Sequence, residues 1–400
     1  MRTWGTLLSL AVTGLTLGCL LLSCADEVVQ PTLSKEEISR MTDSRLLQPA
    51  REIVFETGKA PSKICVSERS GLAYVTCFGR RTFLANGPQV GAELCTIELA
   101  TARVTRCVPT EHPTGIALSP GGSHLVGRPV GLLSATSVFT LYNARDLKGE
   151  STSVETPSYK GSALVDDLGT IYLYWEGERK LERIARDGRS SVSLKAPPVH
   201  MVLGRAEQLL YVSVGQPEWL ESGGPPARLL VVDSVNLETL QSVTLEGRSV
   251  AVNLGVWKGG SALICRADEG IIESLPIAED GRLLPPQVVG DLTGARLHFS
   301  LVVDEKRSLA YCTATSADEK WVLYVVDLKE RKLVGGVTIT PALLRSAPQL
   351  AVVSQTDELW FVTNAFDKIS IYSLDDLVRR AKEAGRRGGA PSSGEPATGH

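Results

Sequence analysis

The side chains best suited to catalysis or metal binding are scattered along this chain. The histidines occur singly, without the i, i+4 spacing by which a helix presents two ligands to one metal: His112, His124, His200, His298 and His400. No stretch has the pattern of a phosphate-binding loop, a dinucleotide fingerprint or a nucleophile elbow. The adjacent Asp166 and Asp167 fall at an expected hairpin turn, where aspartate ordinarily serves turn geometry. We predict no catalytic residue set, no metal site and no cofactor.

Charge and composition narrow the class of partner. The 400 residues carry 42 basic and 45 acidic side chains, whereas a nucleic-acid-binding domain usually carries a marked excess of basic ones. Hydrophobic residues make up 43% and charged residues 22%, as in ordinary globular proteins. We expect a folded chain that does not bind nucleic acid.

From about residue 50 the chain repeats a unit of β-hairpins. The clearest copy, 113–126 (PTGIALSPGGSHLV), predicts a strand, a Gly-rich turn and a second strand, and related copies begin at Pro61, Pro198 and Pro348. A second hairpin follows in most copies, and repeats of about 40–50 residues with four strands each are typical of propellers. Seven copies fit between residues 58 and 378. The repeat therefore predicts an all-β, seven-bladed β-propeller, with an open stack of β-sandwiches as the alternative.

The two ends of the repeat region complement each other. The last copy ends with residues 368–372 as its third strand and lacks a fourth, whereas residues 51–57 form an unpaired strand before the first copy. Pairing this N-terminal strand into the last blade would close the ring and remove exposed strand edges.

The repeats resemble the YVTN family of β-propeller repeats found in many bacterial envelope and surface proteins. Residues 361–364 (FVTN) match the family tetrapeptide except at its first position, and residues 113–122 (PTGIALSPGG) are close to the hairpin that precedes it. The resemblance covers almost the whole chain after the first residues and implies the propeller fold. It leaves function open, because propellers serve as binding modules, enzymes and scaffolds. The family's relatives include lactone hydrolases, but no residue set here can be carried over from them.

In a propeller the first strand of each blade lines the central channel, so residues at the start of these strands share one mouth. Aligning the seven copies puts these residues at equivalent positions: Lys63, Gly115, Gly161, His200, Asn253, Ser300 and Leu350. Lysine and histidine donate hydrogen bonds to carboxylate or phosphate oxygens. We therefore predict an anionic or polar ligand at the mouth, with these candidate ligand-binding residues: Ser62, Lys63, Thr114, Lys160, His200, Asn253, His298 and Gln349. Ordinary solvated channel residues are the alternative.

Arginine and tryptophan, the usual anchors of protein interfaces, recur in the expected loops after the second strands. We predict these interface residues, with ordinary solvated loops as the alternative: Arg80, Arg128, Trp175, Trp219 and Arg266.

A hydrophobic run opens the chain and predicts export. Residues 7–23 follow the positive Arg2, are uncharged, and have a length that suits a signal peptide better than a membrane span. The run ends in residues 21–24 (LLSC), which resemble the lipobox of bacterial lipoproteins. The resemblance implies that Cys24 becomes the lipidated first residue of an envelope protein. A plain secretory signal or a retained anchor is the alternative.

These boundaries divide the chain into four parts. Residues 1–23 are the expected signal peptide and 24–49 a tether, in which Ser34 and Glu37 form a capping box for a short helix. Residues 50–378 are the propeller, and 379–400 are the end of a short basic helix and a disordered tail. The lipid is expected in the outer membrane, with the propeller facing the periplasm or the cell surface.

Export would expose the remaining cysteines to an oxidising compartment, where disulfides form. The first two hairpins are flanked by Cys65 with Cys77 and by Cys95 with Cys107, each pair 12 residues apart. We expect at least one disulfide among these four, with a Cys77–Cys95 bridge as the competing arrangement. Cys265 and Cys312 lie in second strands, where buried free thiols are expected.

The function that best fits these observations is a non-catalytic binding or scaffold module, monomeric and tethered to the envelope by lipid. Its partner would be an envelope protein or a small anionic or polar ligand. The alternative is a hydrolase or lyase acting on lactones or saccharides at the channel mouth. A third interpretation is an accessory subunit of a larger complex.

Overall fold

The computed structural model divides the chain into two units, Met1–Thr32 and Leu33–His400. It describes residues of the second unit: 33–79, 91–110, 115–127, 136–155, 161–175, 179–204, 208–215, 227–245, 250–267, 270–293, 298–315, 320–340, 348–363 and 365–389. No helix within these ranges is long and apolar enough to cross a membrane.

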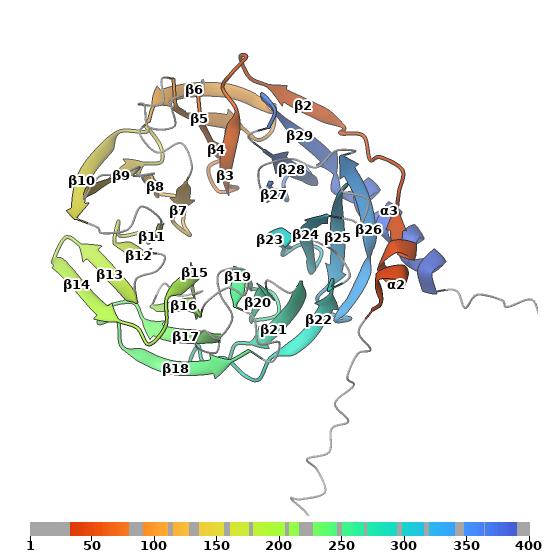
Figure 1. The fold of residues 1–400 in the computed structure, drawn as a ribbon. Helices are drawn as coiled ribbons and strands as arrows, with labels where there is room; N and C mark the ends of the chain where they lie inside the picture. Colours follow the sequence, from red (N-terminus) through yellow and green to blue (C-terminus); the bar gives the residue numbers. More distant parts are fainter. Residues whose placement is uncertain are drawn as a thin grey trace, which may run out of the picture. The chain divides into compact units, whose positions relative to one another are not determined.

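The described strands form seven sheets arranged in a ring, with one edge of each sheet at the centre (Figure 1). Each sheet is a four-stranded antiparallel blade, and one blade gains a short fifth strand. The prediction of an all-β, seven-bladed propeller is therefore confirmed.

The first four blades follow the chain from the innermost strand outward. Blade 1 consists of β3 Pro61–Ser67, β4 Leu72–Cys77, β5 Glu93–Glu98 and β6 Arg103–Pro109, and blade 2 of β7 Ile116–Leu118, β8 His124–Gly127, β9 Thr136–Asn143 and β10 Gly149–Glu155. Blade 3 consists of β11 Gly161–Val165, β12 Ile171–Trp175, β13 Lys180–Ala185 and β14 Gly188–Ser193. Blade 4 consists of β15 Pro198–Leu203, β16 Leu209–Val214, β17 Arg228–Asp233 and β18 Thr239–Thr244.

The last three blades include the two strands that come from the N-terminal end of the unit, β1 and β2. Blade 5 consists of β19 Ala251–Trp257, β20 Ala262–Ala267, β21 Ile271–Pro276 and β22 Gln287–Asp291. Blade 6 consists of β23 His298–Asp304, β24 Leu309–Thr315, β25 Trp321–Asp327, β26 Lys332–Thr340 and the short β1 Thr42–Asp43. Blade 7 consists of β27 Gln349–Val353, β28 Glu358–Val362, β29 Lys368–Ser373 and β2 Arg51–Val54.

The ring closes through β2, which pairs antiparallel with β29 as the outer strand of blade 7. Arg51 also reaches across the blade to Glu358 through two hydrogen bonds of 2.9 and 2.8 Å, a fork geometry that favours arginine with a carboxylate. The closure predicted from the missing fourth strand is therefore confirmed.

The hydrophobic core lies between the blades, because inner strands such as β4 bury side chains on both faces of their sheet, whereas outer strands such as β6 are largely exposed. In β4, Val75 packs against blade 7, whereas the neighbouring Tyr74 packs against Leu125 and Tyr142 of blade 2. Each of the seven pairs of neighbouring blades has one such cluster among the described residues. A blade is therefore stable only when both its neighbours are in place.

The two ends of the ring are built differently, and we name them here. The strand-entry face is the end at which the innermost strands begin, for example at Pro61 and Pro198; the turn face is the opposite end, at which the inner hairpins turn. On the turn face, acidic side chains bind backbone N–H groups of the preceding blade: Glu305 accepts from Lys258 and Gly259 at 2.7 and 3.0 Å.

Two further acidic side chains repeat this contact on the turn face. Asp167 accepts from the N–H of Gly121 at 2.9 Å, and Glu68 accepts from the N–H of Ser354. The neighbouring Asp166 accepts from its own turn, at Leu168 and Thr170. Asp166 therefore serves turn geometry as predicted, whereas the bond of Asp167 to Gly121 joins two blades, a role that the sequence did not predict.

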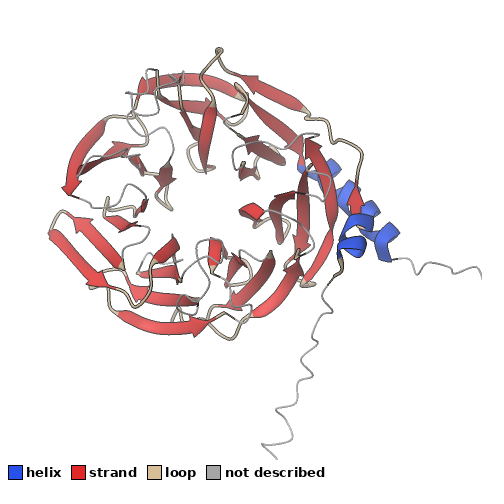
Figure 2. Ribbon diagram, viewed as in Figure 1, coloured by secondary structure: helices blue, strands red, loops and turns tan. Residues whose placement is uncertain are grey.

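Two helices lie outside the ring beside β26 (Figure 2). Helix α2, Lys35–Arg40, begins with the expected capping box, in which Ser34 and Glu37 bond reciprocally. It ends at Arg40, because the chain turns at Met41 to form β1, which pairs parallel with β26.

Helix α3, Leu374–Gly389, begins within the last residues assigned to the propeller and buries an apolar face made of Leu374, Leu377, Ala381 and Ala384. It packs directly on the backbone of β26: a Cβ on Gly385 would lie 2.0 Å from the carbonyl oxygen of Val334.

A buried ion pair joins these N- and C-terminal segments. The side chain of Asp43 is 2% exposed and accepts a 3.0 Å hydrogen bond from Nε of Arg380, while Arg45 forms two bonds to the same carboxylate. Burial alone would raise the pKa of Asp43, but the hydrogen bonds from Arg45 and Arg380 hold it well below its usual range.

We predict that Asp43→Asn lowers the free energy of unfolding by about 3 kcal/mol at pH 7, because it leaves the charge of Arg380 buried without its partner. A depressed carboxylate pKa stabilises the folded state above the unfolded-state value of about 4, and the stabilisation is lost as the pH falls below it. The difference between the original protein and the variant should therefore shrink below about pH 4. Urea unfolding across this pH range measures it.

The matched control is Arg379→Ala, next to Arg380 on α3. Arg379 is exposed and pairs with Asp376 and Glu383, so its loss should cost less than about 1 kcal/mol. Equal losses in the two variants would contradict the structural role of the buried pair.

Candidate functional site

The innermost hairpins of four blades carry the same irregularity where they begin at the strand-entry face. In blades 1, 4, 5 and 6 the register shifts by one residue, so that a bulged residue precedes a regular cross-strand pair. The bulged residues are Ser62, Val199, Val252 and Phe299. A β-bulge re-aims the neighbouring side chains and is frequent beside functional sites.

The pair that follows each bulge is polar on both strands. These pairs are Lys63 with Thr76, His200 with Ser213, Asn253 with Arg266, and Ser300 with Thr313. We name these eight residues the polar rung. The members on the second strand are buried, with side chains that are at most 1% exposed, whereas Lys63, His200 and Asn253 on the innermost strands are half-buried.

Several polar atoms of this rung have no hydrogen-bond partner within the described part of the chain. They are Nδ1 of His200 and the hydroxyls of Thr76, Ser213 and Thr313. A buried polar group without a partner costs about 1–3 kcal/mol, so proteins rarely keep several at one level without a reason.

Positive charge gathers around His200. Burial, followed by the positive charges of Lys63 and Arg266, lowers the pKa of His200 to about 4. The imidazole is therefore neutral at pH 7. The strands β3 and β15, which carry Lys63 and His200, lie on opposite sides of the ring centre (Figure 1). The charge of Lys63 therefore acts on His200 across the channel.

Five of the eight ligand-binding candidates lie in described strands with described side chains. Ser62, Lys63, His200 and Asn253 lie at or beside the bulges, and Gln349 begins β27, which has no register shift. His298 begins β23, but its side chain is not among those described. Thr114 and Lys160 lie outside the described residues. A ligand-binding role for all eight stays a prediction.

Two of the interface candidates are corrected by the structure. Trp175 is the last residue of β12, is 4% exposed, and stacks edge-on against Phe139 at 5.6 Å, so it belongs to the core between blades 2 and 3. Arg266 lies within β20 and is 1% exposed, so it cannot anchor a loop interface. The other candidates, Arg80, Arg128 and Trp219, lie outside the described residues, as does Cys24.

Sequence reasoning missed the second-strand half of the polar rung, although its signal was present in the repeat. Thr76, Ser213 and Thr313 occupy the same place in the tracts 73–76, 210–213 and 310–313. In blade 5 this hydroxyl place is taken by Arg266. Comparing the second strands position by position would have identified Arg266 as a residue of the channel end rather than of a loop.

The structure joins Cys95 to Cys107 by a disulfide across β5 and β6, where the two residues are direct cross-strand partners. Cys65 and Cys77, which were expected as a second candidate pair, are free. The reason is register: Cys65 lies opposite Tyr74, whereas Cys77 lies opposite Pro61. Cys265 and Cys312 are buried free thiols, as expected.

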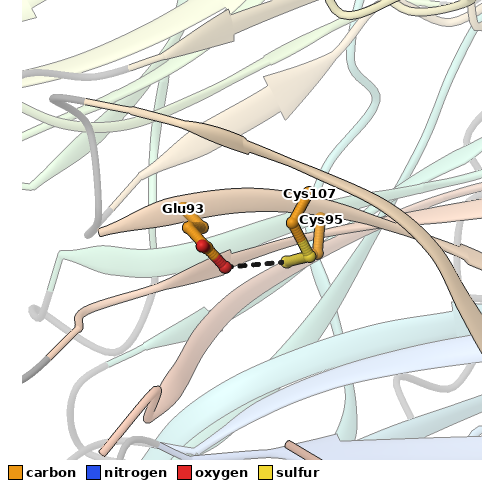
Figure 3. A group of neighbouring side chains, drawn as sticks. All are labelled: Glu93, Cys95 and Cys107. Atoms are coloured by element: carbon orange, nitrogen blue, oxygen red, sulfur yellow. Dashed lines mark hydrogen bonds between the residues drawn. A yellow bond between two sulfur atoms is a disulfide. The ribbon is translucent and has the colours of Figure 1, made fainter. Parts of the chain in front are cut away.

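A carboxylate lies beside this disulfide (Figure 3). An oxygen of Glu93 is 3.8 Å from Sγ of Cys95, and Glu93 also pairs with Lys59. The three side chains lie close enough together to suggest metal ligands. A metal takes cysteine as the thiolate, however, and both sulfurs here are joined to each other. The arrangement is therefore a structural disulfide with an adjacent ion pair.

No family model and no curated protein sequence matches the chain. Solved structures are similar in fold. The β-propeller domain of Cps50 (Swd1) from Myceliophteria thermophila has 13% identity, a TM-score of 0.60, and coverage of 81% of this chain and 99% of that one. Virginiamycin B lyase from Staphylococcus aureus has 14% identity, a TM-score of 0.56 and coverage of 80% and 97%. The WD40 repeats of RRP9 have 12% identity, a TM-score of 0.55 and coverage of 82% and 98%.

We predict that peptide mapping without reduction links Cys95 to Cys107 and finds Cys65 and Cys77 as free thiols. Trypsin can separate the bridged peptides, because Arg103 and Arg106 lie between the two cysteines. Reduction should lower the free energy of unfolding by about 3 kcal/mol, as expected for a loop of this length. A linked Cys77–Cys95 peptide would contradict the register of blade 1.

Proposed function

We propose that the protein is a non-catalytic binding module, tethered to a bacterial envelope membrane, whose strand-entry face receives a protein partner or a small anionic or polar ligand. The polar rung carries the proposal, because it places lysine, histidine and arginine side chains at one end of the channel. Donors of this kind suit carboxylate or phosphate groups.

The contrast between the two faces supports a binding surface at the strand-entry end. On the turn face, acidic side chains such as Glu305 and Asp167 are engaged in tying neighbouring blades together. The strand-entry end instead carries buried polar atoms that make no bond within the described residues. A rigid scaffold that displays uncommitted polar groups at one end suits binding.

The tether belongs to the same proposal. Residues 21–24 (LLSC) favour a lipid on Cys24, which would hold the propeller at the membrane and raise its local concentration near envelope partners. The similar solved structures include both a lyase and a WD40-repeat protein, so the shared fold is compatible with binding and with catalysis.

We predict that mild crosslinking in the native envelope captures a stoichiometric partner that is lost from the variant Lys63→Ala/His200→Ala. The double substitution removes two polar groups of the strand-entry end from half-buried positions. Mass spectrometry of the purified complexes measures the loss.

The matched control is Arg186→Ala/Lys258→Ala, which removes two exposed basic residues from the turn face. A partner lost equally from both variants would reflect general loss of charge. A partner kept by the strand-entry variant would move the interface to the outer loops, and capture of no partner would favour a small ligand or the enzyme alternative.

We predict that Cys24→Ala releases the protein from the membrane fraction, because the substitution removes the proposed site of lipid attachment. Fractionation with immunodetection measures the release, and radiolabelled fatty acid should label the original protein but not the variant. Continued membrane retention of the variant would mean that another segment anchors the chain.

A further inference from the structure

The polar rung gathers cationic side chains from blades that are far apart in the sequence. Lys63 comes from blade 1, His200 from blade 4, and Arg266 from blade 5. Arg266 is almost completely buried, and its positive charge acts on His200 and on the Cys312 thiol of blade 6.

The described strands that pack most extensively against β15 carry no charged side chain. β15 packs against β11, β16 and β19. On these strands the titratable side chain is Tyr211, whose hydroxyl donates to the carbonyl of Gly281. The charges that act on the imidazole within the described residues, those of Lys63 and Arg266, are both positive.

We propose that the polar rung binds a small anion carrying a carboxylate, sulfate or phosphate group, held by Lys63, His200 and Arg266, and that His200 takes up a proton when the anion binds. This inference rests on the proposed function and names the chemistry of its ligand. Nδ1 of His200 is buried and has no partner among the described residues, and it is a hydrogen-bonding group that the anion would engage.

The proton uptake follows from the electrostatics. With two positive neighbours and little solvent, the protonated imidazole is disfavoured, and the pKa of His200 lies at about 4. A bound anion opposes both positive charges and accepts a hydrogen bond from the ring, so it raises that pKa. By linkage, the anion must then bind more tightly as the pH falls from the pKa of His200 in the complex towards its value in the free protein, by at most tenfold per pH unit, and the affinity should be nearly constant at higher pH.

Sulfate is the probe for this test, because it keeps two negative charges across the pH range. The full chain is purified in detergent with its histidine rings isotopically labelled, and the signal of His200 is identified by its loss in His200→Gln. We expect sulfate to shift the His200 resonance and to raise the pKa of the ring by at least about one unit. An unmoved His200 resonance at tens of millimolar sulfate would overturn the proposal.

Calorimetry of variants then tests the roles of Lys63 and His200 in the polar rung. Lys63→Met keeps the aliphatic stem but removes the charge, and should weaken sulfate binding about 10- to 100-fold, as expected for a charged hydrogen bond. The exposed Lys258→Met on the turn face should leave the affinity unchanged. His200→Gln should remove the pH dependence of binding. Equal affinities for Lys63→Met and Lys258→Met would place the anion elsewhere and overturn the site.

The anion can be free or part of a larger partner, and the crosslinking experiment separates these sources when it is repeated in saturating sulfate. Release of the captured partner by sulfate means that the partner carries the anionic group. A partner retained while sulfate occupies the rung means that the ligand is a free small anion. A captured partner together with no sulfate response at His200 would overturn the anion site and leave the proposed binding function standing.

Discussion

The pairing of β2 with β29 is the constraint on which the rest of the structure depends. Every hydrophobic cluster lies between two blades, so no blade is complete without both neighbours. Blade 7 draws three strands from the end of the repeat region and the fourth from its beginning. Ile53 of β2 and the following Phe55 also fill the seam between blades 7 and 1. Closing the last blade therefore completes a sheet and a core at once, because β2 covers the edge of β29 that would otherwise be exposed.

Closure also explains how distant residues come to share one end of the channel. The number of blades sets the distance between innermost strands on opposite sides of the ring. Lys63 of β3 and His200 of β15 therefore line the same channel. The turn-face contacts hold neighbouring blades in register, as Glu305 does for blades 5 and 6. The strand-entry end is thus positioned by contacts made at the other end of each blade. Binding groups on such a support need little ordering when a ligand arrives.

The repeated pattern of strands and turns was enough to predict the blade number and the closing strand, because these follow from periodicity and strand count. The alignment of the entrance residues holds for four blades, but Gly161 and Leu350 pair with Trp175 and Phe361, which are not the equivalent second-strand positions. Register was harder to predict. The hairpin turn places Ser67 opposite Leu72 and therefore Cys65 opposite Tyr74, three residues away from Cys77. Likewise, Trp175 and Arg266 were interpreted as loop residues, because strand ends cannot be located to one residue from composition. Burial of an arginine between blades depends on contacts that no single strand reveals.

The position of the N-terminal segment bears on how a tethered propeller can present its channel. Residues 33–47 do not cross the strand-entry end: α2 packs beside α3, β1 pairs with the outer strand β26, and Leu47 donates to the carbonyl of Thr338. The buried pair of Asp43 with Arg380 holds this segment to the helix that ends the described chain. A force applied to the N-terminal segment would therefore act on β26, the outer strand of blade 6, rather than on an innermost strand. The described N-terminal segment and the polar rung therefore lie on different parts of the ring, the first at the outer edge of blade 6 and the second at the channel.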